Sequence, residues 1–247
     1  MIVAGLLGLA IGSFLNVVIT RLPAHRSLWG PRSACPGCGA SIAWHDNIPV
    51  VSFLALRRRC RACGMSISWQ YPLVEAVTAL AFAAAWWAFG PGIDFLVATI
   101  LLSALIAITA IDLRHQIIPD LITLPGVVAG VVANLATQRV PWLESLLGIA
   151  VGGGLFFVII LASGGGMGGG DMKLGAMLGA FLGWKVVLFS VFVAVVLGGG
   201  LALGLLASGK RGRTDPIPFG PFLATGGAAS LFWGERVVAW YLSAFHK

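Results

Sequence analysis

Charged residues are scarce in this chain. Asp, Glu, Lys and Arg together make up only 10% of its 247 residues, whereas hydrophobic residues make up 58%, and the mean hydropathy is +0.95. So few charges leave too little polar surface to cover a water-soluble globule. The charges that are present cluster between long uncharged apolar runs, which is typical of helices that cross a lipid bilayer.

The first 20 residues carry no charge at all. They therefore lack the basic beginning of a secretory signal, and they also lack its small-residue cleavage site. We expect residues 2–20 to remain in the membrane as an anchor.

The apolar runs predict an all-α polytopic membrane protein with about eight transmembrane helices, because roughly 20 residues cross the hydrocarbon layer of a bilayer. Only Gly183, Trp184 and Lys185 separate the sixth run from the seventh. The expected spans are residues 2–20, 73–89, 95–111, 121–136, 142–162, 173–184, 186–207 and 219–244.

The chain has a net charge of +7, and the placement of its positive charges indicates how the protein is oriented in the membrane. Arginines crowd the loop at about 21–72, and Lys210, Arg211 and Arg213 share another loop. Loops rich in Lys and Arg stay in the cytoplasm, so we expect the N-terminus outside and the 21–72 loop inside. A nucleic-acid partner is not expected, because the cations are grouped by loop and do not line a basic face with stacking aromatics.

The four cysteines form two CxxC pairs, Cys35 with Cys38 and Cys60 with Cys63. Their flanks repeat one ten-residue pattern, CPGCGASIAW at 35–44 and CRACGMSISW at 60–69. Disulfides are the alternative, but cytoplasmic thiols stay reduced. Four thiolates complete the tetrahedral shell of zinc and leave no position for a reactive water, so we predict a structural zinc site.

Two of the nine acidic residues lie at span ends that the predicted topology places at one membrane face. Asp112 ends the third span, and Asp171 follows the glycine-rich segment 164–170. Two adjacent carboxyls can share one proton, which gives a base for water and an acid for a carbonyl group. Paired membrane carboxylates also occur in proton-coupled transporters, so transport is the alternative function. Asp120 begins the fourth span, where we expect it to cap the helix.

Further motifs occur in a fixed order along the chain. They are GSFLNVVITRLP (12–23), the two CxxC pairs, DNIPV (46–50), YPLVE (71–75), Asp112, GGGD ending at Asp171 with Lys173, and PIPFGPF (216–222). With this set the chain resembles the bacterial type IV prepilin peptidases, which are A24-type membrane aspartic proteases.

The resemblance implies that Asp112 and Asp171 are the catalytic pair, that residues 91–247 form the peptidase domain, and that residues 1–90 carry the zinc loop. It implies cleavage of the basic leader of type IV prepilins or type II secretion pseudopilins, after a glycine and ahead of a hydrophobic helix, at the cytoplasmic face of the bacterial inner membrane. Methylation of the new N-terminus by S-adenosylmethionine is implied as well. The resemblance does not identify the residues that contact this methyl donor, and Glu75 and Asn47 are the candidates. Membrane lipid is the other expected partner.

Overall fold

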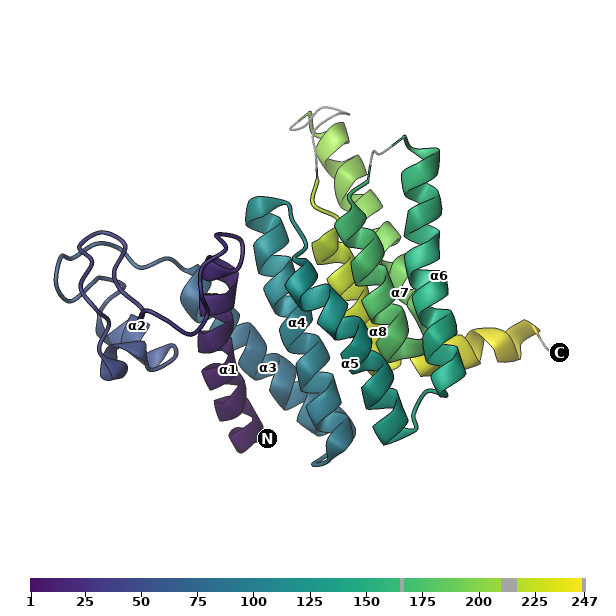
Figure 1. Cartoon of the computed structure of the whole chain (residues 1–247), viewed down its shortest axis with the longest axis horizontal. Coiled ribbons are helices and arrows are strands. Elements are labelled where there is room, and N and C mark those ends of the chain that lie inside the picture. The colour runs from purple at the N-terminus through teal and green to yellow at the C-terminus, as the bar shows by residue number, and fades with distance from the viewer. Residues whose placement is uncertain (165–166, 210–216, 246–247) are drawn as a thin grey trace. The chain divides into compact units, whose positions relative to one another are not determined.

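The computed structural model describes residues 1–164, 167–209 and 217–245 (Figure 1). Within these ranges every regular element is a helix, and only two isolated bridges, Ala34 with Ser41 and Arg59 with Ser66, join extended segments. The prediction of an all-α protein is therefore confirmed. The chain divides into two compact units, Met1–Ala107 and Ile108–Lys247, with the boundary inside helix α4 (Ile93–His115).

The first unit is built around the close packing of α1 (Ile2–Arg21) and α3 (Gln70–Phe89). A Cβ atom on Gly8 would lie 2.6 Å from Cα of Ala79, and one on Gly12 would lie 2.7 Å from Cα of Glu75. Glycines four residues apart thus let the two backbones approach, as is common between helices in membranes. The long connection between α1 and α3 carries the short helices η1 (Trp44–Asn47) and α2 (Val51–Ala55).

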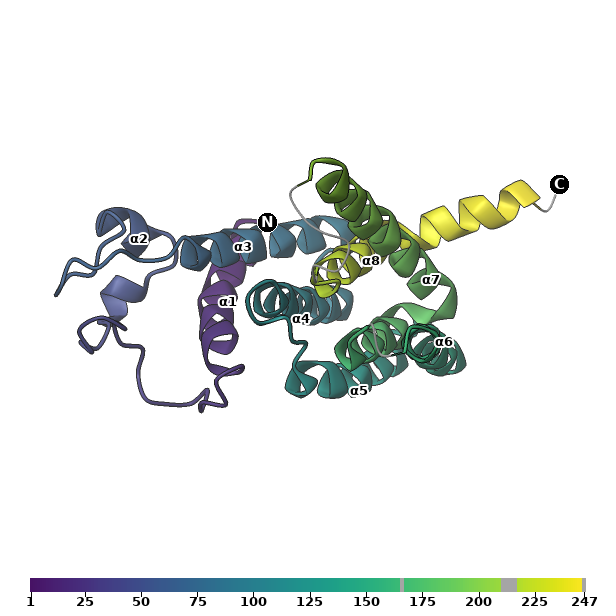
Figure 2. The same ribbon diagram turned by 90° about the horizontal axis from the view of Figure 1, so that it is seen from above.

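The second unit contains the end of α4 and four further helices, α5 (Asp120–Thr137), α6 (Trp142–Ala162), α7 (Gly169–Ala207) and α8 (Gly220–Phe245). Helices α6 and α7 also pack through glycines, Gly148 against Gly179 and Gly152 against Gly175. Figure 2 shows α5, α6 and the first part of α7 side by side.

Helix α7 is interrupted at Gly183, which has φ 76° and ψ 168°, a conformation that an L side chain strongly disfavours. Gly175 precedes the kink and Val187 follows it, yet a Cβ atom on Gly152 of α6 would contact both residues. The two parts of α7 therefore lie against the same part of α6, and the chain folds back at the kink. Both ends of α7 therefore lie at the same end of the unit in Figure 1. The break predicted between the sixth and seventh apolar runs coincides with this kink.

Six helices among the described residues are long and apolar enough to cross a membrane, namely α1, α3, α4, α5, α6 and α7. The predicted membrane class agrees with this finding, but the count of eight spans is not confirmed. The segments 173–184 and 186–207 are the two parts of α7. Helix α8, predicted as the eighth span at 219–244, is not among the six, since Glu235, Arg236 and several small or polar residues lower its hydropathy.

Candidate active site

Asp112 lies in the last turn of α4, and its side chain is buried with only 5% of the residue exposed. The backbone N–H of Gly220 donates a hydrogen bond to Asp112 Oδ2 at 3.0 Å. Gly220 is the first residue of α8, where backbone amides have no partner within the helix. A free amide at a helix start therefore stabilises negative charge on Asp112.

Asp171 lies in the first turn of α7 and is 8% exposed. Its backbone amide donates to the carbonyl oxygen of Gly168, the N-cap of the helix. Its Oδ1 atom is buried and has no hydrogen-bond partner among the described residues. The carboxyl groups of Asp171 and Asp112 are close enough to interact electrostatically, so the structure brings the two predicted aspartates together.

Ile118, in the α4–α5 connection, packs against the starts of both α7 and α8. A Cβ atom on Gly170 would lie 2.8 Å from Cβ of Ile118. One on Gly220 would lie 3.2 Å from Cδ1 of Ile118 and 2.5 Å from Asp112 Oδ2. Glycine at 170 and 220 is thus required for the close packing that surrounds the aspartates.

Sequence reasoning gave no role to Gly220 or Ile118. The available signal was the Phe-Gly-Pro segment at 219–221, a glycine at the start of an apolar run. Part of the glycine-rich segment, residues 165 and 166, lies outside the described residues, as do Lys210, Arg211 and Arg213 in the second basic loop.

Asp120 is not the helix cap that the sequence predicted. The N-cap of α5 is Pro119, and Asp120 is the first residue within the helix. Instead, Nζ of Lys173 lies 2.7 Å from each carboxylate oxygen of Asp120. This ion pair joins the starts of α5 and α7.

The four cysteines form one cluster in the first unit. The sulfur atoms of Cys35, Cys38, Cys60 and Cys63 all lie within 4.8 Å of one another, and those of Cys35 and Cys63 are 3.7 Å apart. In a tetrahedral zinc site with Zn–S bonds of about 2.3 Å, the sulfur atoms lie about 3.8 Å apart. The cluster therefore fits a metal ion of this kind.

The two CxxC segments share one backbone fold. The amide of Gly39 donates to Cys35 O and that of Gly64 donates to Cys60 O, both at 2.9 Å. Both glycines have positive φ, 71° at Gly39 and 73° at Gly64. The repeat seen in the sequence is thus a repeat in structure, and each half presents two sulfur atoms.

The backbone of the first segment favours a thiolate. Hydrogen bonds from the amides of Cys38 and Gly37 lower the pKa of the Cys35 thiol to about 6. At Cys63 the Met65 amide also lowers the pKa, but desolvation and hydrogen bonds with the other three sulfur atoms outweigh it and raise the pKa to about 11. A bound metal ion would favour the thiolate form of all four.

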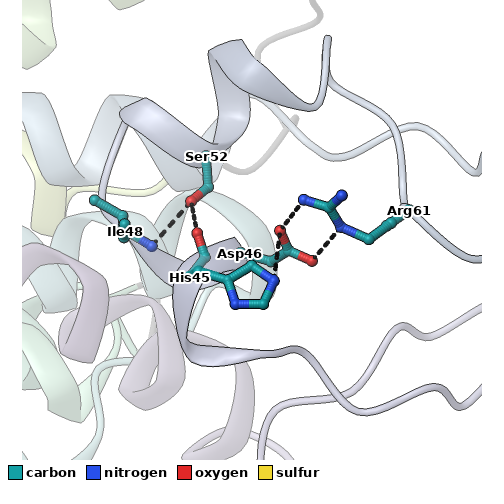
Figure 3. A network of polar contacts seen from close by, with 5 residues as sticks. All are labelled: His45, Asp46, Ile48, Ser52 and Arg61. Atoms are coloured by element: carbon teal, nitrogen blue, oxygen red, sulfur yellow. Dashed lines mark hydrogen bonds and ion pairs between the residues drawn. The ribbon is translucent and has the colours of Figure 1, made fainter.

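Asp46 ties the second CxxC segment to η1 (Figure 3). Arg61, between Cys60 and Cys63, donates two hydrogen bonds to the Asp46 carboxylate, from Nε at 2.9 Å and from Nη2 at 2.6 Å. These hydrogen bonds hold the pKa of Asp46 below its usual value. Ser52 Oγ accepts from the Ile48 amide and donates to the His45 carbonyl, which fixes the start of α2 on η1.

The comparisons with known proteins cover nearly the whole chain. The family model described as "Bacterial Peptidase A24 N-terminal domain" matches residues 6–89, and "Type IV leader peptidase family" matches residues 99–203. A protein of Burkholderia pseudomallei (strain 1026b) named "Prepilin leader peptidase/N-methyltransferase" is 40% identical over 92% of this chain and 84% of its own length.

This chain belongs to the type IV leader peptidase family. Proteins with the same name from Aeromonas hydrophila and Legionella pneumophila are 38% and 34% identical, over 97% and 98% of this chain and 93% and 94% of their own lengths. No solved structure matches the chain significantly. The resemblance drawn from the motifs is confirmed, and with it the class of enzyme, a membrane-bound aspartic peptidase.

The segment matched by the N-terminal model also holds a buried carboxylate, Glu75, which is 6% exposed. Its Oε2 atom accepts a hydrogen bond from the Val50 amide at 2.7 Å. Val50 has φ 60°, a conformation uncommon for a β-branched residue. Two motifs of the sequence, DNIPV and YPLVE, thus meet in a contact that fastens the cysteine loop to α3.

Proposed function

We propose that this chain removes the basic leader of type IV prepilins or type II secretion pseudopilins by hydrolysis, with a water molecule activated by Asp112 and Asp171. The observation that carries the proposal is the pair of buried, interacting carboxyls at the end of α4 and the start of α7. The substrate class rests on the relatives, which are named prepilin leader peptidases.

The hydrogen bonds of the two aspartates support different roles. The Gly220 amide donates to Asp112, which favours a carboxylate there, so we assign Asp112 as the base that takes a proton from water. Asp171 Oδ1 has no donor in the described part of the chain, so we assign to Asp171 the shared proton, which it gives to the oxygen of the scissile carbonyl. The resulting tetrahedral intermediate then breaks its C–N bond. The departing amine takes the proton that Asp112 removed from water, and a hydroxyl group of the intermediate returns a proton to Asp171 as the new carboxyl group forms.

The site would act at the cytoplasmic face of the bacterial inner membrane, with the N-terminus outside. Arg21 at the end of α1 and the arginines of the cysteine loop support this orientation, because basic loops are retained in the cytoplasm. The division of the chain into residues 1–90 and a peptidase domain at 91–247 is part of the same proposal.

Methyl transfer to the new N-terminus is proposed as a second activity, with S-adenosylmethionine as donor, since the relatives are named N-methyltransferases. We also propose that Cys35, Cys38, Cys60 and Cys63 hold a structural zinc ion. The ion would cross-link the two CxxC segments and leave no ligand position for a substrate.

One assay tests both activities. Detergent-solubilised protein is incubated with a prepilin and labelled S-adenosylmethionine, and the size and label of the product are followed. We expect the wild type to shorten and label the substrate, and Asp112→Asn and Asp171→Asn to do neither while still inserting in the membrane. A matched control is Glu235→Gln, which alters a carboxylate that is 65% exposed on α8 and should leave cleavage unchanged. Cleavage by either aspartate variant would refute the catalytic pair.

A further inference from the structure

An ion pair and a packing contact join residues 118–120 to the start of α7 in the second unit. Nζ of Lys173 lies 2.7 Å from each carboxylate oxygen of Asp120. Two residues before Asp120, Cβ of Ile118 lies 2.8 Å from the position that a Cβ atom on Gly170 would occupy. Residues three apart in a helix share a face, so both contacts hold the same face of α7.

These two contacts bracket Asp171. Gly170 precedes it directly, and Lys173 follows two positions later. Successive residues of a helix are rotated by about 100°, so Asp171 and Lys173 lie nearly on opposite sides of α7. Asp171 is accordingly buried, whereas the Lys173 side chain is 32% exposed. The ion pair can therefore fix the position of Asp171 through the helix backbone without touching its carboxyl group.

The segment that holds α7 is also tied to Asp112 by the covalent chain. Asp112 lies in the last turn of α4, and only residues 116–119 separate that helix from α5. This connection is restrained, because the Gln116 amide donates to the Asp112 carbonyl oxygen at 2.9 Å and the ring of Pro119 fixes its φ. A closed path thus runs from Asp112 through the connection, across the ion pair and back along α7 to Asp171.

The chain that leads into Asp171 supplies little restraint of its own. Residues 168–170 are all glycine, which allows more backbone conformations than any other residue. Lys173 also gains nothing from its own helix, because cations are favoured at helix C-termini and Lys173 lies near the N-terminus of α7. The contact with Asp120, and not the stability of α7 itself, therefore accounts for a lysine at this position.

From these observations we propose that Lys173 and Asp120 are positioning residues. Their ion pair holds the first turn of α7 so that the carboxyl groups of Asp171 and Asp112 can share a proton. When the pair is broken, the first turn of α7 moves and the two carboxyl groups no longer act together. The inference rests on the proposed function, since it gives two residues outside the aspartate pair a part in the same hydrolysis.

Neutral variants test the ion pair. Lys173→Met and Asp120→Asn each remove one charge and keep nearly the same side-chain size. Lys185→Met is the matched control, because Lys185 lies on α7 beyond the kink and pairs with Glu144 at 3.5 Å. For each variant, kcat and KM of prepilin cleavage are measured in detergent, and membrane insertion and thermal stability are checked. An exposed ion pair adds little to folding stability, so we expect all three variants to insert and melt like the wild type.

We expect kcat to fall about 10- to 100-fold in Lys173→Met and in Asp120→Asn, because small displacements of reacting groups have effects of this size. KM should change less than about twofold, since neither residue is assigned a contact with the substrate. Lys185→Met should cleave at the wild-type rate. Wild-type kcat in either of the first two variants, or a loss confined to KM, would overturn the proposal.

Two double variants separate position from charge. Asp120→Asn with Lys173→Met leaves no unpaired charge, and Asp120→Lys with Lys173→Asp restores an ion pair with its charges exchanged. The neutral double variant should stay as slow as the single variants, and the exchanged variant should recover kcat at least about tenfold, as coupled residues do. Recovery in the neutral double variant would assign the loss to an unpaired charge. No recovery in the exchanged variant would exclude the ion pair as its cause, so either result contradicts the proposal.

Hydrogen exchange provides a readout that does not require cleavage. The backbone amides of residues 169–177 should exchange faster in Lys173→Met and Asp120→Asn than in the wild type, because the start of α7 opens more readily. The same amides should exchange at the wild-type rate in Lys185→Met, and unchanged exchange in the first two variants would contradict the proposal. If exchange rises but the wild type cleaves nothing, the proposed hydrolysis fails while the role of the ion pair in holding α7 stands.

Discussion

Replacing Gly220 with alanine tests the hydrogen bond that α8 provides to Asp112, one of the two proposed catalytic residues. The added Cβ atom would lie 2.5 Å from Asp112 Oδ2 and 3.1 Å from its Cγ, so the carboxylate must turn away. Cδ1 of Ile118 lies 3.2 Å from the same position and limits movement of the new methyl group. The Gly220 amide then loses a hydrogen bond to a charged group, which contributes about 1.5–3 kcal/mol. If that stabilisation is lost from the transition state, kcat falls about 10- to 100-fold.

The assay for this variant is the steady-state rate of leader cleavage by purified protein in detergent. Gly199→Ala is the control, because its Cβ atom meets no neighbour within 4 Å, and it should cleave at the wild-type rate. Both variants should elute like the wild type on size exclusion, which separates a displaced carboxylate from a misfolded protein. A Gly220→Ala enzyme with wild-type kcat would refute the role given to the α8 amide.

Three further predictions concern the cysteine loop. Cys38→Ser should lower bound zinc well below one ion per chain in elemental analysis, and a stoichiometric ion in that variant would contradict the four-sulfur site. Glu75→Ala leaves the Val50 amide without its acceptor, at a cost of about 1–3 kcal/mol, so limited proteolysis of the loop should accelerate; unchanged digestion would contradict the contact. Because Arg61 lowers the pKa of Asp46, their pairing stabilises the loop above about pH 4 and is lost as the pH falls further. Proteolysis measured against pH should show that loss in the wild type and not in Asp46→Asn.

The proximity of Asp112 and Asp171 could be predicted because it follows from local patterns. Asp112 ends one apolar run, Asp171 begins another, and the distribution of arginines assigns both ends to one face. The break between the sixth and seventh apolar runs was also visible at Gly183, and the structure places the kink of α7 at this residue. The two CxxC segments were recognisable as a repeat, and the structure gives them the same hydrogen bonds.

Contacts between distant parts of the chain could not be predicted in this way. Gly220 is 108 positions from Asp112, and no pattern of single residues connects them. Asp120 was expected to cap its own helix, but Lys173, 53 positions away, pairs with it instead. The count of eight spans is not confirmed, because two of the predicted spans are the two parts of α7 on either side of Gly183, and α8 is less apolar than the six helices that qualify as candidate spans.

The most direct test of the central claim is a double-mutant comparison of leader cleavage. The rate constant is measured for Asp112→Asn, Asp171→Asn and the variant that carries both substitutions, with membrane insertion checked for each. Two residues that act as one unit lose their function together, so each single variant should fall to the background rate and the double variant no further. Substantial cleavage by either single variant, or losses that multiply in the double variant, would contradict catalysis by a shared pair.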